Sequence, residues 1–329
     1  MRSVSLVPTC FLVRVAMRQS VRLVAEHLNP TDMLTIATET EQQARDLLTC
    51  EVWGTGLSAE QFKERELRLR GHRWAKSTLT SWLWKNADGS VLASCETFSD
   101  EANVGSRRGT VAMIASVFTE PSLRKRGYAE QMLKAVIAKH RADQNCLGLA
   151  LFSEIGTTYY QRLGFWPVPA FDTFFDPRAD APNVEWLETP LPSPKHPPAD
   201  QHTLRLSLSS DRLDWHLERE RIYGSALGKK TLKHHGARVG DSTITWTAYW
   251  KTNELQVLSL DLRDSAHLAP LIHAASHAAH VAELPCVRIW ETLALNSGRR
   301  VERTDEVAMF LPLAPGIQAW TMVERGLWA

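Results

Sequence analysis

A short basic loop contains the residue types and spacing most suited to binding an anion. It runs Arg124-Lys125-Arg126-Gly127-Tyr128-Ala129 and follows an apolar stretch that ends near Thr119. The first N–H groups of a helix lack intrahelical partners and carry a partial positive charge, and a glycine at the turn lets a phosphate approach the backbone. Three basic side chains add local charge, and Ala129 is small where the first helical turn would meet the anion. The loop therefore predicts a pyrophosphate cradle, with a basic helix cap that binds nothing as the alternative.

The elements on either side of this loop must hold it in place. The continuous apolar run 110–119 is typical of a buried central strand, and 129–141 has helical periodicity. A second buried strand is expected over 146–152, then a short helix over 157–163 and a last strand over 165–175. The loop would thus join a central strand to a helix.

The segments before the central strand are predicted to form helices and a hairpin. A mostly helical region is expected over 31–48, and the spacing from Ser58 to Gln61 is that of a capping box that opens a second helix. The stretches 78–85 and 90–98 flank Asp88-Gly89, a turn typical of a β-hairpin. Strands and helices in this order indicate an α/β protein of the α+β kind, in which helices flank a mixed central sheet.

Composition and charge limit the classes of function. The chain has 329 residues, enough for about two domains, and a formal net charge of +1 from 38 basic and 37 acidic residues. This balance gives no overall field that would attract nucleic acid or a membrane, and no apolar run approaches the roughly 18 residues that span a bilayer. The five cysteines are far apart, which favours reduced thiols over disulfides or a zinc site. We expect a cytoplasmic protein without nucleic-acid or membrane partners.

Residues 1–20 are expected to be an N-terminal extension, either a tail or a targeting segment. The first 25 residues contain four arginines and no acid, which resembles a mitochondrial presequence. A disordered tail, a start at Met17 and a first strand over 21–26 are the alternatives. A mitochondrial location therefore competes with the cytoplasmic one.

A proline-rich stretch is the best candidate for a domain boundary. Five prolines lie within 189–198, and proline favours extended backbone. We therefore expect a first domain over 21–188, a linker over 189–199 and a smaller C-terminal α/β domain over 200–329.

The C-terminal domain is expected to contain two helices and three strands. The helices are predicted over 212–223 and 266–282, and the strands over 243–249, 255–262 and 287–291. The order of two strands, a helix and a strand is like that of the first domain, although no sequence identity supports a duplication.

The basic loop and a block downstream of it resemble two motifs of the GNAT N-acetyltransferase superfamily. Arg-x-x-Gly-x-Ala after a strand resembles its coenzyme A pyrophosphate motif, and 153–165 resembles its second block, where a tyrosine stands four residues before Gly-Phe. Tyr160 holds that position, whereas Ser153 replaces the asparagine that most members have. The resemblance covers about residues 20–175 and implies the GNAT fold for the first domain, acetyl-CoA as co-substrate and no metal.

The same resemblance implies which residues contact the cofactor. These are Val117, Phe118, Thr119, Arg124, Lys125, Arg126, Gly127, Tyr128, Ala129, Ser153 and Tyr159.

A closer resemblance is to the fungal L-lysine N6-acetyltransferase family. It rests on Ser-Val-Phe-Thr-Glu-Pro over 116–121, on Phe-Ser-Glu-Ile-Gly over 152–156, and on the later run 215–223 with Gly236-Ala237 and Trp246. This likeness extends over nearly the whole chain from Val21. It implies a small-molecule amine as acceptor, with free L-lysine the leading candidate.

The superfamily resemblance implies direct attack of a neutral amine on the thioester. The strands over 114–119 and 147–152 would splay to admit the acyl-pantetheine arm. A backbone N–H near Phe118 would stabilise the developing oxyanion, by about 3 kcal/mol in comparable sites.

Two proton transfers would accompany this attack. The side-chain amine of lysine has a pKa near 10.4, so a carboxylate must accept its proton at neutral pH. Glu96, Glu120 and Glu154 are the candidates, each with a solvated surface carboxylate as the alternative. Tyr160 would protonate the leaving thiolate, with a core aromatic as the alternative.

A histidine pattern and other possible acceptors offer alternatives to this function. His273, His277 and His280 share one face of an expected helix, but no nearby acid or cysteine completes a ligand set, so no metal is expected. Another amino acid, a polyamine, a protein lysine or a xenobiotic could replace lysine as acceptor. A non-catalytic acyl-CoA sensor is a third hypothesis, against which the presence of Tyr160 argues. The sequence leaves the oligomeric state open.

Overall fold

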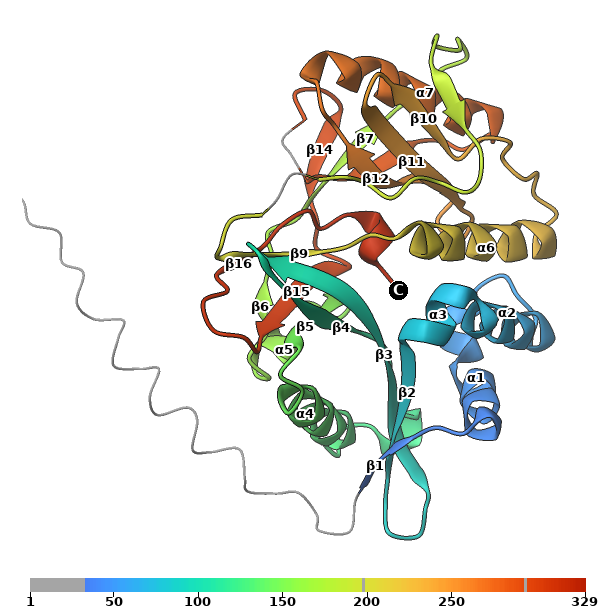
Figure 1. The fold of residues 1–329 in the computed structure, drawn as a ribbon. Helices are drawn as coiled ribbons and strands as arrows, with labels where there is room; N and C mark the ends of the chain where they lie inside the picture. Colours follow the sequence, from blue (N-terminus) through green and yellow to red (C-terminus); the bar gives the residue numbers. More distant parts are fainter. Residues whose placement is uncertain (1–32, 197–198, 293–294) are drawn as a thin grey trace, which may run out of the picture.

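The computed structural model describes residues 33–196, 199–292 and 295–329, whose strands form two sheets (Figure 1). The expected extension over 1–20 and the expected strand over 21–26 lie outside the described residues.

The first sheet is mixed. In spatial order its strands are β1 (Met33–Ile36), β2 (Leu79–Lys85), β3 (Val91–Val104), β4 (Arg107–Phe118), β5 (Cys146–Ser153), β15 (Val307–Pro312) and β6 (Trp166–Pro167). Two short strands, β9 (Thr203–Leu206) and β16 (Ala319–Trp320), extend it from β3. Along the main path only β4 and β5 run parallel. The sequence prediction of a mixed central sheet, with a hairpin of β2 and β3, is confirmed.

Helices lie on both faces of this sheet (Figure 1). On one face α4 (Tyr128–Arg141) packs Met132 and Leu133 against Ile114 and Leu149. On the other face Met113 belongs to a separate core cluster. That cluster includes residues of α2 (Ala59–Gly71), α3 (Arg73–Thr78) and α6 (Ser210–Ala226). Because alternate residues of a strand point to opposite faces, the two cores share the same strands.

The second sheet packs against α6 and against an alanine-rich helix. Its strands, in spatial order, are β14 (Arg299–Glu302), β7 (Phe171–Phe175), β13 (Val287–Trp290), β12 (Glu254–Asp261), β11 (Ser242–Tyr249), β10 (Gly236–Val239) and β8 (Glu185–Leu187). The alanine-rich α7 (Leu268–Val281) buries seven of its residues against this sheet. The helices and strands predicted for this region are present, and β7, β8, β10 and β14 were not predicted as part of it.

The remaining helices are short or lie before the first hairpin. They are α1 (Glu39–Trp53), α5 (Thr158–Gln161) and the 3-10 turns η2 (Pro121–Leu123), η3 (Ser265–His267) and η4 (Arg325–Leu327). The capping box predicted for Ser58 and Gln61 is present at the start of α2.

Two expectations about local structure are wrong. The helix expected from residue 31 begins at Glu39, because Thr38 and Glu41 form a capping box and the preceding four residues pair with β2 instead. The single strand expected over 165–175 is two strands in different sheets, β6 and β7. Val168-Pro169-Ala170 separates them, and proline cannot donate to a ladder.

The strands also cross the domain limits expected at 188 and 200. Strands β7 and β8, which precede the linker, lie in the second sheet, whereas β9, β15 and β16, which follow it, complete the first. Hydrogen bonding between strands, rather than the proline-rich segment, decides which sheet each one joins.

Candidate active site

A gap opens between β4 and β5, where the sequence predicts that the strands splay. Their parallel pairing runs from Thr110 with Cys146 to Ile114 with Leu151 and ends there. Beyond it Ser116 has a positive φ of 53°, and the register of β4 against β3 shifts. The predicted divergence is thus present, and a cavity of about 820 Å³ lies at this point.

The basic loop forms one wall of this cavity. Lys125 and Gly127 have positive φ angles of 63° and 81°, and Gly127 caps α4 without any side-chain hydrogen bond. The N–H groups of the first turn of α4 therefore lack a side-chain acceptor, and a ligand oxygen could take that place. The Nε of Arg124 donates to the carbonyl of Thr119 at 3.0 Å, which fixes the arginine beside the strand end. The loop fits the pyrophosphate of acetyl-CoA.

Most of the residues predicted for the site line this one cavity. They are Glu96, Val117, Phe118, Thr119, Arg124, Lys125, Gly127, Tyr128, Ala129, Glu154, Tyr159 and Tyr160.

Three predicted residues do not line it. Arg126 donates to the carbonyl of Ser122 at 3.4 Å on the outer side of the loop. Ser153 is buried, and its hydroxyl donates to the carbonyl of Gly156 at 2.5 Å, so it closes the turn before α5. Glu120 is exposed and accepts a hydrogen bond from the hydroxyl of Ser122.

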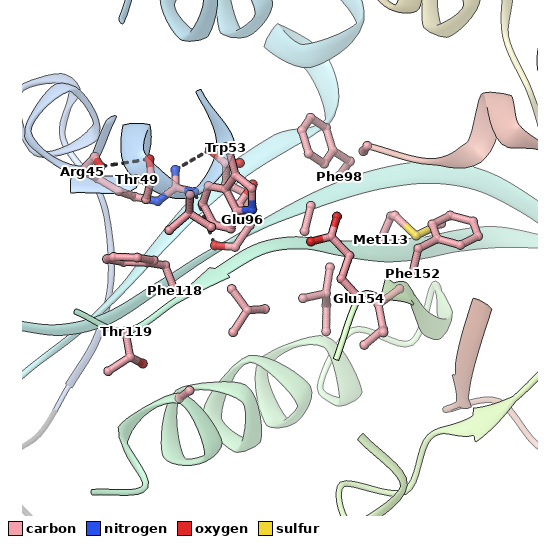
Figure 2. A pocket seen from close by; sticks show the side chains of 18 of the residues that line it. Arg45, Thr49, Trp53, Glu96, Phe98, Met113, Phe118, Thr119, Phe152 and Glu154 are labelled. Atoms are coloured by element: carbon pink, nitrogen blue, oxygen red, sulfur yellow. Dashed lines mark hydrogen bonds and ion pairs between the residues drawn. The ribbon is translucent and has the colours of Figure 1, made fainter. Parts of the chain in front are cut away.

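Glu96 is held in a buried ion pair. Its carboxylate lies 2.7 Å from Arg45 Nη1, and each side chain is only 7% exposed (Figure 2). Burial alone would raise the pKa of Glu96, but the charge and hydrogen bond of Arg45 outweigh it and hold this pKa below its usual value. A carboxylate so paired is a weak proton acceptor, and its first role is to neutralise Arg45.

Of the glutamates that line the cavity, Glu154 is the one whose carboxylate keeps its acceptor capacity. It follows the end of β5, and Figure 2 shows its carboxylate directed into the cavity. Among the described residues it has no ion pair and no hydrogen-bond partner, whereas Glu66 pairs with Arg65 and Glu130 with Lys134. Glu154 is therefore the best placed of the three predicted bases.

Tyr160 lies on α5 with its side chain buried at the cavity wall. Burial raises the pKa of its hydroxyl far above the usual value for tyrosine, so that the group stays protonated at neutral pH. The neighbouring Tyr159 packs edge-on against it, and burial raises the pKa of Tyr159 to about 12. A tyrosine that keeps its proton can act as a proton donor.

A charged wall of the cavity was not predicted from the sequence. Arg45 on α1, Arg65 and Arg70 on α2, and Arg219 on α6 all line the cavity. A signal exists in α1, where Arg45, Asp46 and Thr49 are buried while Leu47 and Leu48 are more than half exposed. A helix that buries its polar residues and exposes leucines indicates a polar site beneath it.

The other patterns have structural roles. In the parts of the chain that the structure describes, no cluster of histidine, cysteine and acidic residues could hold a metal ion. His273 lies 3.1 Å from Asp180 at the surface, and the described cysteines are free thiols. Among the helices of residues 33–196, 199–292 and 295–329, none has the length and hydropathy of a bilayer span.

A divergent strand pair, an uncapped helix behind a basic turn, and a buried tyrosine define an acyl-CoA-dependent acyltransferase site. Comparison with known families agrees. Residues 38–168 match the acetyltransferase (GNAT) domain, and residues 184–309 match the LYC1 GNAT-like C-terminal domain.

Individual proteins are similar in sequence or in fold. A protein of Yarrowia lipolytica named lysine acetyltransferase is 24% identical, over 68% of this chain and 74% of its own. A probable N-acyltransferase of Enterococcus faecalis V583 shares the fold with a TM-score of 0.55 and 11% identity, over 86% of this chain and 72% of its own. A GCN5-related N-acetyltransferase from Kribbella flavida has a TM-score of 0.51 and 17% identity, over 85% of this chain and 71% of its own.

Both matched segments are of GNAT type, so the chain is similar to the GNAT N-acetyltransferases, whose acyl donor is acetyl-CoA. Its expected similarity to the fungal lysine acetyltransferases is confirmed by the C-terminal match and by the Yarrowia relative.

Proposed function

We propose that the protein transfers the acetyl group of acetyl-CoA to the side-chain amine of free L-lysine. The observation that carries this proposal is the match of residues 184–309 to the LYC1 GNAT-like C-terminal domain, because α6 of that region lines the cavity beside the first domain. The name of the Yarrowia relative supports the same acceptor. Acetyl-CoA, when bound, supplies the acetyl group as a thioester.

The acceptor amine must lose a proton before or during the attack. Glu154 accepts this proton, because it is the cavity glutamate without an ion pair among the described residues. Its place at the end of β5 puts it beside the gap where the strands part. General-base assistance of this kind is worth about 10²- to 10⁴-fold in rate.

Arg45 positions the backbone that faces the reacting carbonyl. Its Nη2 donates to the carbonyl of Ser116 at 3.4 Å, so one end of the peptide between Ser116 and Val117 is fixed. In a trans peptide the N–H points away from the C=O, so the N–H of Val117 points away from Arg45. Val117 and Phe118 both line the cavity, and the N–H of one of them is the proposed donor to the developing negative charge.

Tyr160 completes the reaction by giving its proton to the leaving sulfur. The raised pKa of its hydroxyl keeps that proton in place until the thiolate forms. The thioester has then become a thiol, and the ammonium has lost two protons in becoming an amide. Glu154 takes the first, and the second restores the proton that Tyr160 gave to the sulfur.

Thiol release from acetyl-CoA, measured over a panel of amines, tests this proposal. We expect turnover with free L-lysine, little with lysine inside peptides, and a loss of about 10²-fold or more in kcat for Glu154→Gln. Glu120→Gln is the matched control, because that carboxylate lies outside the cavity and its variant should keep full activity. Turnover on peptides but not on free lysine would exclude the lysine assignment. Tight binding of coenzyme A without turnover on any amine would identify a sensor instead.

A further inference from the structure

About half of the charged side chains that line the cavity form ion pairs, and the exceptions are informative. Arg45 pairs with Glu96, Arg65 with Glu66, and Arg70 with Asp46. Such pairs cancel, so they offer little to a charged ligand.

Four cations of the cavity have no ion pair among the described residues. Arg124 and Lys125 belong to the loop at α4, where the pyrophosphate is expected. The other two are Arg219 on α6 and Lys251 in the turn between β11 and β12. Helix α6 packs on the face of the first sheet that α4 does not cover, so these two cations are separate from the pyrophosphate loop (Figure 1).

Aromatic rings hold the guanidinium of Arg219 in place. Its carbon lies 4.3 Å from the ring centroid of Trp328 and 5.4 Å from that of Tyr249. Stacking uses the face of the guanidinium and leaves its N–H groups, which lie in the plane, free to donate at the edge. Trp328 also has Arg325 at 4.3 Å, so the ring itself is fixed.

The donors of Arg219 lack acceptors within the described residues. Its Nε is buried without a hydrogen-bond partner, and no hydrogen bond or ion pair engages its terminal nitrogens. Buried donors are nearly always satisfied, which points to an acceptor that belongs to a ligand. Lys251 lies beside Arg219, because both residues line a second, small cavity as well.

We propose that Arg219, assisted by Lys251, binds the carboxylate of the acceptor, so that the site selects amino acids over polyamines and other amines without an acid group. A planar guanidinium matches a carboxylate in charge and geometry. Two unpaired cations would also repel a polyamine, whose far end is positively charged. The inference rests on the proposed function for the place of the reacting amine, and it adds what recognises the other end of the acceptor.

Calorimetric titration of the full chain, in the presence of coenzyme A, tests this without requiring turnover. The probes are L-lysine, L-lysinamide, L-ornithine and 1,4-diaminobutane, so that each acid is compared with a partner that lacks the carboxylate. We expect the wild-type protein to prefer each acid, and Arg219→Gln to lose about 10- to 100-fold in affinity for the acids alone. Arg219→Lys, which keeps the charge, should recover part of that affinity.

A matched control lies two residues along the same helix. Arg221 pairs with Asp214 and Glu218 and does not line the cavity, so Arg221→Gln should leave all four affinities unchanged. An Arg219→Gln protein that binds acids and their partners as the wild type does would overturn the proposal. So would a variant that weakens the binding of coenzyme A instead, or a wild-type protein that prefers the partners without a carboxylate. Preference for ornithine over lysine, abolished by Arg219→Gln, would uphold carboxylate recognition while excluding lysine as the acceptor.

Discussion

Replacing Arg45 with methionine should destabilise the protein strongly, because it leaves Glu96 as an unpaired carboxylate in the interior. Both side chains are 7% exposed, so water cannot take over the role of the guanidinium. The cheapest response of the variant is to protonate Glu96. At pH 7 that costs 1.36 kcal/mol for each unit between pH 7 and the ordinary pKa of 4.5, or about 3 kcal/mol. Lost hydrogen bonds to Ser94 and Ser116 bring the expected loss to about 3–5 kcal/mol.

The loss of unfolding free energy in Arg45→Met depends on pH. In the wild type the folded-state pKa of Glu96 is depressed, so the ion pair contributes stability above pH 4.5 that disappears as the pH falls through the folded-state pKa. In Arg45→Met the folded-state pKa of Glu96 is raised, so the variant loses stability as the pH rises. The difference in unfolding free energy between the two proteins should therefore shrink by about 2 kcal/mol or more between pH 7 and pH 5.

Urea unfolding at pH 7 and pH 5 measures both quantities. The double variant Arg45→Met with Glu96→Gln should recover much of the loss, because no charge is then left without a partner. Arg68→Met is the matched control: Arg68 is 45% exposed and pairs with Glu218, so its loss should stay below about 1 kcal/mol. A stable Arg45→Met protein, or a loss equal at both pH values, would refute the view that Glu96 serves mainly to balance Arg45.

Three further predictions concern the cofactor loop, the proton donor and the second sheet. Gly127→Glu should raise the KM for acetyl-CoA about 100-fold or more, because it places a carboxylate at the cradle. Gly127→Ala should raise it less, because it shares the backbone strain that any side chain meets at a φ of 81° but adds no charge, and its Cβ has only Gln131 within 4 Å. Steady-state kinetics would contradict the cradle if both variants kept the wild-type KM. Tyr160→Phe should lower kcat about 10²-fold with an unchanged KM for acetyl-CoA, and the raised pKa of Tyr160 predicts that activity does not fall between pH 7 and pH 9 through its ionisation. Burial raises the pKa of Glu220 to about 7, so the carboxyl group of Glu220 keeps its proton to a higher pH in the folded state than in the unfolded state. The stability that this protonated group contributes is therefore lost as the pH rises from 4.5 through 7. Unfolding free energies at pH 5.5 and pH 8 should show this decline in the wild type and a flatter profile in Glu220→Gln, while equal slopes would count against it.

The local features of the fold and the cofactor loop could be predicted from the sequence. The capping box at Ser58, the turn at Asp88-Gly89 and the loop before α4 each depend on residues within a few positions of one another. Their hydrogen bonds and backbone angles are short-range, so a pattern of residue types is enough to indicate them. The position of Tyr160 at the cavity was likewise predicted from a short-range pattern, its place four residues before Gly-Phe.

The choice among the three carboxylates could not be made in this way. Glu96 is excluded as a free base by Arg45, which lies 51 positions earlier, and the pair exists only because the fold brings this residue of α1 next to β3. Arg219 likewise faces the cavity through its contacts with Trp328, more than 100 positions later. Long-range contacts of this kind leave no periodicity in the chain, and they decided which charged groups remain available to a ligand.

The position of β15 determines when the active site can form during synthesis. This strand pairs with β5 along six residues, yet it is made about 150 residues later. Until Val307–Pro312 leaves the ribosome, the edge of β5 is open, and an open edge is a template for pairing with other chains. The cofactor-binding half therefore cannot be completed by an N-terminal fragment, even though every residue of its basic loop is present. Removal of residues from Val307 onward should yield a protein that aggregates, rather than a smaller enzyme.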